Sequence, residues 1–375
     1  MLLRTETDID ATSFAAGPTT KKRRLEWVDY AKGIAILCVV FGHTVGGFQS
    51  AGLKPMSGLH EYVTQVMYAF RMPTLFFLSG LFLRQSVQKK VSVFVLDRLK
   101  TLIFPCLLWS IIQAAAHQAA AKYANWGPDF FDMMKMLPFH PFGELWFLYV
   151  LFAVSVLILA LHKMGMRPGG IALTGIAIYL FQPFFSADHW GELGLACKFS
   201  PYVAAGFFLS SRLSPNLVDL PRRVLICGFI GSMTILCLLT PVVSHRSVVG
   251  GPLLAIFGVA GMIALSKCLA RDKRFKVLRY VGSRSLPIYL AHPLATGGLR
   301  ILIVDISGVR TNWFVIGIVW VGGLMFPICL DWFARRTRTD WIFSLRRERL
   351  SIPSVGVDGF SSPSGIALKS ARLSP

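Results

Sequence analysis

The chain has 375 residues, of which 54% are hydrophobic and only 15% are charged. Soluble globular proteins carry about 25% charged residues, so the composition excludes an ordinary water-soluble domain. The net charge of +20 would be typical of a nucleic-acid-binding protein. In so hydrophobic a chain it is better explained by basic loops at a membrane surface, and we expect no nucleic-acid partner.

The apolar residues fall in blocks of about 17 to 25, the length that an α-helix needs to cross a bilayer. The blocks lack the alternation of β-strands, and helices satisfy their own backbone polar groups in lipid. We therefore predict an all-α fold, a polytopic integral membrane protein of about ten transmembrane helices. The predicted spans are 28–48, 62–83, 101–120, 145–161, 170–186, 196–211, 223–241, 251–269, 285–304 and 312–333.

The basic residues predict the orientation of these spans. Most of the 39 Lys and Arg residues fall in the N-terminal segment, in alternate loops and in the C-terminal tail. Because basic residues gather on the cytoplasmic side, both termini are predicted to be cytoplasmic. The first span has no convincing cleavage site, so we expect it to be retained. The predicted organisation is a cytoplasmic segment at 1–24, a membrane domain at 25–335, and a basic and then disordered tail at 336–375.

Motifs for common cofactors are missing from the sequence. The seven cysteines lie mostly within apolar blocks and show neither CxxC spacing nor a pairing pattern, which argues against zinc and disulfides. The chain has no P-loop, no dinucleotide fingerprint and no HExxH motif. We therefore expect no metal and no bound cofactor.

The first span carries three ionisable residues, Asp29, Lys32 and His43. Charged groups inside a span are costly, which makes each of them a candidate functional residue. Lys32 and His43 are eleven residues apart, or about three helical turns, so they share one face and lie about 16 Å apart along the axis. The alternatives are an interfacial ion pair between Asp29 and Lys32, and a buried, hydrogen-bonded histidine at position 43.

The second span contains Arg71 directly before Met72 and Pro73. A guanidinium at this depth needs a carboxylate, carbonyl groups or a water-filled cavity. The proline can open the helix and free backbone carbonyls for other partners. A purely structural role for Arg71 is the alternative.

Two further polar sets lie in later spans. In the ninth span, Tyr289 and His292 follow Ser285 at i+4 and i+7, so the three share one helix face; an interhelical polar seam is the alternative. At the outer edge of the fourth span, Glu144 and Trp146 form a set with Tyr149. This set is either a substrate platform or an aromatic belt at the membrane interface, and the belt is favoured.

Four segments together resemble the membrane-bound acyltransferase family 3, and within it the subgroup of fucose 4-O-acetylase-like proteins. They occur in the order and spacing of that family, from about residue 25 to residue 335. The segments are WVDYAKGIAI at 27–36 with VVFGH at 39–43, MP at 72–73 with FFLSG at 76–80, LWFL at 145–148, and SLPIYLAH at 285–292.

The resemblance implies that an acyl group, usually acetyl from acetyl-CoA, is transferred to a hydroxyl of a glycan or lipid-linked sugar. It also implies a bacterial inner-membrane location, contact with membrane lipids, and polysaccharide-assembly proteins as partners. In the family His43 is catalytic, and the basic residue eleven positions earlier, often Arg, is here Lys32. The subgroup often has His where this chain has Arg71, so an acceptor at that position would differ from a fucosyl unit.

Acyl transfer to an alcohol needs a base for the hydroxyl proton, and a neutral imidazole suits that role. It also needs positive or hydrogen-bond-donating groups for the developing oxyanion. Direct attack and an acyl-histidine intermediate both remain open. The predicted catalytic residues are His43 and Arg71, and the predicted substrate-binding residues are Asp29, Lys32, Tyr289, His292 and Trp146.

A carrier that exports a glycan or a small amphiphile is the main alternative function, because buried charges also line transport pathways. The sequence shows no internal repeat of the kind that many carriers have. A structural subunit of a polysaccharide-assembly complex is a third hypothesis, which leaves the charges inside the spans unexplained.

Overall fold

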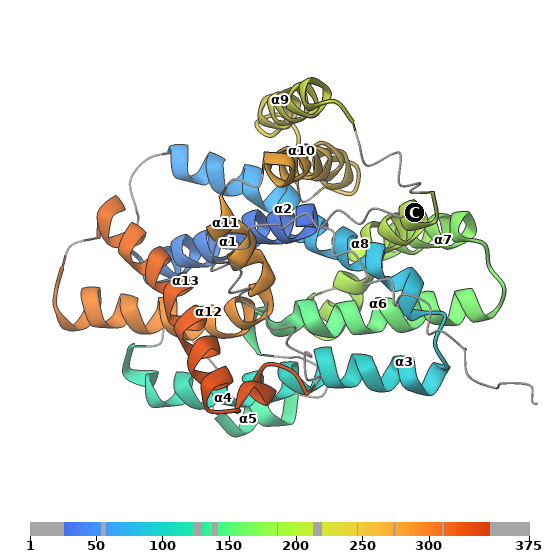
Figure 1. Cartoon of the computed structure of the whole chain (residues 1–375). Helices are drawn as coiled ribbons and strands as arrows, with labels where there is room; N and C mark the ends of the chain where they lie inside the picture. The colour runs from blue at the N-terminus through green and yellow to red at the C-terminus, as the bar shows by residue number, and fades with distance from the viewer. Residues whose placement is uncertain are drawn as a thin grey trace, which may run out of the picture.

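In the computed structural model, the described residues form helices and no strands (Figure 1), which confirms the all-α prediction. The predicted segment 1–24, much of the loop 121–144 and the tail beyond residue 345 lie outside the described residues. The structure describes residues 26–53, 58–123, 130–136, 142–185, 187–212, 220–245, 247–272, 275–309 and 311–345.

Within these residues, eight helices are long and apolar enough to cross a membrane. Each corresponds to one of the ten spans predicted from the sequence. The structure therefore agrees with a multi-pass membrane protein. The eight helices are α1 (Glu26–Ser50), α2 (Gly58–Ser86), α6 (Trp146–Lys163), α8 (Ala187–Arg212), α9 (Arg222–Leu239), α10 (Gly250–Asp272), α12 (Ser285–Arg300) and α13 (Trp313–Arg336).

The other two predicted spans form shorter helices. The span at 170–186 corresponds to α7 (Pro168–Leu180), whose 13 residues reach only about 20 Å. The α-helix ends at Leu180, and Pro183 lies in the 3₁₀ turn that follows. Proline has no backbone N–H to donate to the preceding turn, so it does not continue the helix. The span at 101–120 corresponds to α4 (Phe104–Ala119), which continues α3 (Val91–Arg98) through a π-helical turn. The number of ten spans and the cytoplasmic position of both termini stay predictions.

Helices α1 and α2 occupy the middle of the molecule, and α9 and α10 lie together on one side of them (Figure 1). Helices α3 and α4 lie on the opposite side, with the short helix α5 (Phe130–Met136) beside α4. Helix α2 runs unbroken through Pro73, so the proline does not open the helix. Residues near the middle of α1 and α2, such as Val39 and Phe76, are buried within the protein.

Two glycines allow helices α2 and α8 to approach closely. A Cβ on Gly80 of α2 would meet the carbonyl oxygen of Val203 of α8, and a Cβ on Gly206 would meet that of Phe77. Small residues at such crossings are a common packing device between membrane helices. They fix the position of α8, which forms one wall of the larger cavity described below.

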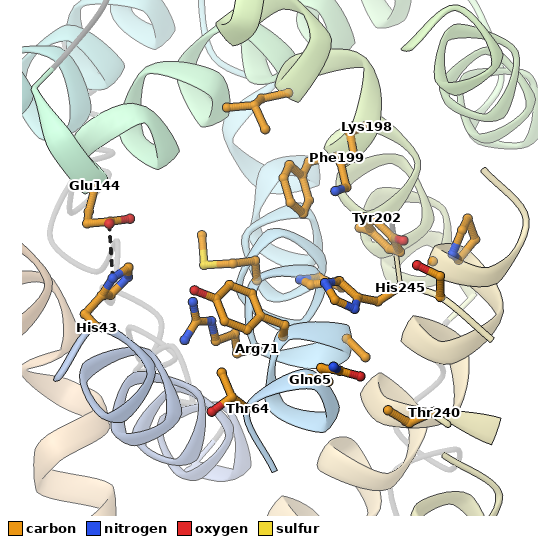
Figure 2. A pocket seen from close by; sticks show the side chains of 18 of the residues that line it. His43, Thr64, Gln65, Arg71, Glu144, Lys198, Phe199, Tyr202, Thr240 and His245 are labelled. Carbon is orange, nitrogen blue, oxygen red and sulfur yellow. Dashed lines mark ion pairs between the residues drawn. The ribbon is translucent and has the colours of Figure 1, made fainter. Parts of the chain in front are cut away.

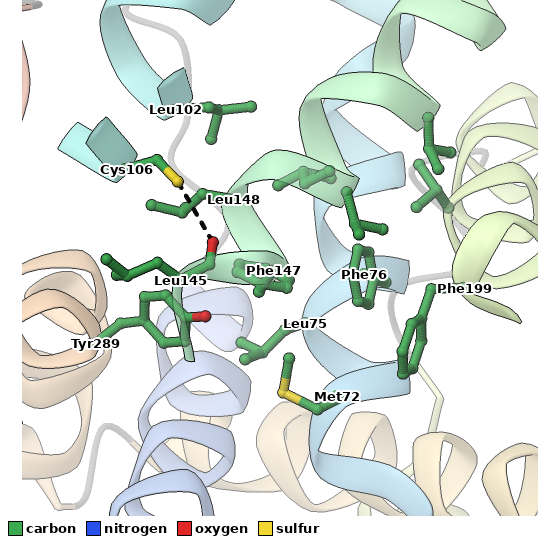
Figure 3. Packing of buried hydrophobic residues seen from close by; sticks show 14 of the residues in the cluster. Met72, Leu75, Phe76, Leu102, Cys106, Leu145, Phe147, Leu148, Phe199 and Tyr289 are labelled. Carbon is green, nitrogen blue, oxygen red and sulfur yellow. Dashed lines mark hydrogen bonds between the residues drawn. The ribbon is translucent and has the colours of Figure 1, made fainter. Parts of the chain in front are cut away.

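A cluster of aromatic rings joins α2, α6 and α8 (Figure 3). The ring centroid of Phe76 lies 4.7 Å from that of Phe147 and 4.5 Å from that of Phe199. Trp146 stacks on Phe199 at 5.5 Å. Burial of these large rings favours one fixed packing of the three helices, and it holds the start of α6 in place against α2.

Candidate active site

His43 and Glu144 are in direct contact at the centre of the site, as an ion pair when the imidazole is protonated (Figure 2). His43 lies in the second half of α1, and Glu144 lies in a 3₁₀ turn (Gly143–Leu145) that leads into α6. The distance from His43 Nδ1 to Glu144 Oε1 is 3.0 Å. Two segments about a hundred residues apart in sequence are thus brought into direct contact.

The partner of His43 decides which of its ring nitrogens is available for chemistry. An ionised carboxylate only accepts hydrogen bonds, so Nδ1 of His43 carries the proton that is donated to Glu144. In the neutral ring the other nitrogen, Nε2, is then the proton acceptor. A histidine held in this way by a carboxylate has the arrangement of a general base.

Arg71 of α2 is buried beside this pair. Its NH1 group donates to the carbonyl oxygen of Cys38 at 3.2 Å, and its guanidinium carbon lies 3.7 Å from the ring centroid of Tyr68. Its Nε atom has no hydrogen-bond partner among the described residues. Gly42 makes room for the guanidinium, since a Cβ there would meet NH1. Arg71 thus places a positive charge next to α1, with donor capacity to spare.

Two residues of α12 support the pair from the other side. The hydroxyl of Tyr289 donates to the backbone carbonyl oxygen of Glu144, which ties the turn before α6 to α12. The ring of His292 lies 5.3 Å from the ring of His43, centroid to centroid. Nδ1 of His292 contacts the carbonyl oxygens of Ile288 and Tyr289 at 3.1 and 2.8 Å. Since carbonyls only accept, this nitrogen carries the proton of the buried ring.

A cavity of about 920 Å³ opens beside the pair, with His43 and Glu144 in its wall. Its volume is within the range of sites for small ligands. Figure 2 shows Lys198, Phe199, Tyr202 and His245 on the side of this cavity that lies away from His43 and Glu144. Polar and aromatic groups thus surround the space, as a ligand rich in hydroxyl groups requires. Its lining also includes Tyr68, Arg71, Trp146 and Tyr289.

A second cavity, of about 550 Å³, lies between the ends of α1, α4 and α12. It shares His43, Tyr68 and Glu144 with the larger cavity. The ion pair therefore stands where two separate spaces meet. A reaction between two substrates needs such a meeting point, because each substrate then approaches the same imidazole from its own side.

Residues 25–332 match the family model described as an acyltransferase domain. The chain belongs to acyltransferase family 3. No curated protein and no solved structure matches it. Together with the eight apolar helices, the match makes this protein a multi-pass membrane acyltransferase, and it favours an enzyme over the carrier and structural alternatives.

The structure brings five of the seven residues predicted for the acyltransferase site close together. His43, Arg71, Trp146 and Tyr289 line the larger cavity, and His292 contacts His43 without lining either of these two cavities. Trp146 stacks on Phe199 within the protein, so it does not have the lipid-facing position of an interfacial belt.

Asp29 and Lys32 lie elsewhere in the acyltransferase. They are near the start of α1, and neither of the two cavities includes them. Asp29 is buried, and Nζ of Lys32 lies 5.7 Å from the ring centroid of Phe82. The regular helix between Lys32 and His43 keeps them about 16 Å apart along its axis, so the two residues cannot act on the same atom.

The sequence interpretation did not assign Glu144 a catalytic role. It grouped this residue with Trp146 as part of an interfacial set. A carboxylate directly before an apolar span was the available signal, because a charge at that point needs a partner within the protein. The identity of the partner depended on the packing of α1 against the turn before α6, which no local pattern contains.

Proposed function

We propose that this acyltransferase is a membrane O-acetyltransferase, which moves an acetyl group from acetyl-CoA to a hydroxyl of a glycan or lipid-linked sugar. The observation that carries the proposal is the His43–Glu144 pair at the meeting point of two cavities. One substrate would approach His43 from each cavity, which is the arrangement that direct transfer requires.

In the proposed reaction, Nε2 of His43 takes the proton of the acceptor hydroxyl as its oxygen attacks the thioester carbon. The carbon–sulfur bond then breaks, and the departing CoA thiolate receives the proton from the imidazolium. Glu144 holds the ring in the required tautomer through the 3.0 Å contact and stabilises the imidazolium that forms. An acyl-histidine intermediate, in which Nε2 itself attacks the thioester, is the alternative sequence of steps.

Arg71 is proposed to stabilise the oxyanion of the tetrahedral intermediate. Its guanidinium is buried, borders the larger cavity and has an Nε atom without a hydrogen-bond partner among the described residues. A fixed positive group in a site of low dielectric constant is worth far more to a developing negative charge than it would be in water. Tyr289 and His292 support this arrangement from α12.

The larger cavity is the proposed acceptor site. Trp146 and Tyr202 provide flat aromatic surfaces for a sugar ring, and Lys198 and His245 provide polar contacts. A hydroxyl-rich ligand needs such partners, since its polar groups lose water on binding. The resemblance to fucose 4-O-acetylase-like proteins favours a deoxysugar as the acceptor. That subgroup often has histidine where this chain has Arg71, so the proposed acceptor differs from a fucosyl unit.

Lys32 is proposed to attract the phosphates of CoA near the cytoplasmic face, together with the basic loops. The predicted setting is a bacterial inner membrane, where the donor arrives from the cytoplasm and polysaccharide-assembly proteins supply the acceptor. Lysine is a common phosphate ligand because its ammonium is a compact point charge.

Transfer of labelled acetyl groups from acetyl-CoA to cell-surface glycans by the purified full chain tests the proposal. The His43→Ala variant is expected to lose at least about 10³-fold in rate, since it removes the base. His162→Ala is the matched control. His162 lies at the C-terminal end of α6, far from Glu144, pairs with Gln88 and lines neither of the two cavities. Unchanged transfer by a correctly inserted His43→Ala variant would refute the assignment of the base.

A further inference from the structure

We infer that the smaller cavity holds the acyl chain of the donor, and that glycines on α1 and α12 set the length of chain that fits. The inference rests on the proposed function, because it takes an acyl-CoA as the donor. The cavity measures about 550 Å³ and has His43 and Glu144 in its wall. A chain lying in it would present its carbonyl end to the imidazole.

Two helix faces form the walls. Helix α1 contributes His43, Gly46 and Gly47, which are spaced at i, i+3 and i+4 and therefore share a face. Helix α12 contributes Pro293 and Gly297, which are four residues apart and also share a face. Both walls carry glycine where a side chain would otherwise project into the space between the helices.

These glycines differ from those that serve helix packing. A Cβ placed on Gly46, Gly47 or Gly297 would meet no described atom within 4 Å, whereas one on Gly80 or Gly206 would meet a backbone carbonyl. Glycine in membrane helices is usually explained by close contact between backbones. That explanation fails at the first three positions, where the missing side chains leave room for another molecule.

The chemistry of the lining favours an aliphatic chain over a sugar. Ala116, Ala120 and Leu294 supply apolar surface between the glycine faces, and apolar surface favours methylene groups through the hydrophobic effect. The larger cavity is lined by more ionisable side chains, among them Arg71 and Lys198. Of the two spaces that meet at His43, the smaller one is thus the better match for an acyl chain.

Two long polar side chains that line the smaller cavity are already bound to other parts of the protein. Gln113 donates to the carbonyl oxygen of Leu290 at 2.9 Å, and Arg300 donates to Asp305 at 3.1 Å. Buried polar groups that have partners need none from a ligand. These residues therefore place no demand on the occupant for polar groups.

Competition binding with the full-length protein tests the inference. Labelled acetyl-CoA is displaced by unlabelled acetyl-CoA or butyryl-CoA, for the native chain and for Gly297→Val and Gly46→Val. Each valine fills part of the space next to the chain, so the affinity for butyryl-CoA relative to acetyl-CoA should fall by about tenfold or more. Gly317→Val is the control, because Gly317 of α13 also faces open space but lines neither cavity.

The outcomes separate the inference from the function on which it rests. A fall in relative butyryl-CoA affinity for both cavity variants, with Gly317→Val unchanged, supports the acyl site. Unchanged selectivity in correctly folded Gly297→Val and Gly46→Val, with acetyl-CoA still bound, overturns the acyl site and leaves the proposed function standing. A change of selectivity on Lys198→Ala instead assigns the chain to the larger cavity. A native chain that binds no acyl-CoA refutes both proposals.

Discussion

Both ends of helix α1 contain glycine, but the glycine near the start is tightly packed and the glycines near the end face open space. Near its start, a Cβ on Gly33 would meet the carbonyl oxygen of Leu278, in the short helix α11 (Lys276–Ser283). Toward its end, a Cβ on Gly46 or Gly47 would meet no described atom within 4 Å. The first end packs closely against α11, and the other borders both of the cavities that meet at His43.

This contrast separates structural from chemical roles along one helix. Asp29 belongs to the packed end, where Gly282 of α11 lies against its carbonyl oxygen. His43 belongs to the open end, where its ring is held by Glu144 and borders space for substrates. Changes at the open end should therefore alter rate with little effect on folding, and changes at the packed end should do the reverse.

The largest effect after loss of His43 itself is expected at Glu144. Glu144→Gln keeps the size of the side chain but removes the charge that fixes the imidazole tautomer, so the rate should fall by about 10²- to 10⁴-fold. Acetyl transfer by the purified variant measures the fall. Glu192→Gln is a control, because Glu192 lies in α8 and lines neither cavity. A near-native rate for Glu144→Gln would show that the ion pair is only structural.

A smaller effect is expected from Gly42→Ala, which displaces the side chain of Arg71 without replacing Arg71 itself. The added Cβ would meet NH1 of Arg71, the mobile end of a long side chain, so the guanidinium shifts and the backbone stays. Because the oxyanion stabiliser would be misplaced, the rate should fall by about tenfold or more. Gly231→Ala in α9 is the control, since a Cβ there meets no described atom. Equal rates for the two variants would exclude a catalytic role for Arg71.

The smallest effect on the rate, with the largest effect on folding, is expected at the packed end. In Gly282→Ala the new Cβ would meet the backbone carbonyl of Asp29, which cannot move aside as a side chain can. We expect a loss of about 1–3 kcal/mol in the free energy of unfolding, while the remaining folded enzyme keeps its rate.

Thermal unfolding in detergent, combined with rates per folded molecule, checks this prediction. Gly317→Ala serves as the control, and alanine in place of an open helical glycine should be neutral or slightly stabilising. A folded Gly282→Ala variant with native stability but a reduced rate would contradict the division of α1 into a packed end and an open end.

Much of the fold could be predicted from the lengths of the apolar runs. Every one of the ten predicted spans contains helix, because each run is too long and too apolar for a strand in lipid. The length of α7 could not be predicted in the same way. Hydropathy counted Phe184 and Phe185 toward a span, but Pro183 in the turn after α7 keeps them out of the helix.

The candidate site could be predicted only in part. A charged or ionisable group inside an apolar run has a high desolvation cost, and this singled out His43 and Arg71 without any structure. The same argument also singled out Asp29 and Lys32, which line neither cavity. The partner of His43 could not be found in this way, since Glu144 lies at the edge of a different span. The glycines that border the smaller cavity could not be predicted either, because the sequence does not show whether a glycine packs against another helix or faces a cavity.

The sequence by itself determined that the protein lies in a membrane, that it is helical, and which of its residues are costly to bury. These properties depend on the composition and periodicity of each segment alone. Only the tertiary structure decided that His43 contacts Glu144, that Arg71 lies against Gly42, and that two cavities meet at the imidazole. Such contacts join distant segments, and their geometry follows from how whole helices pack against one another.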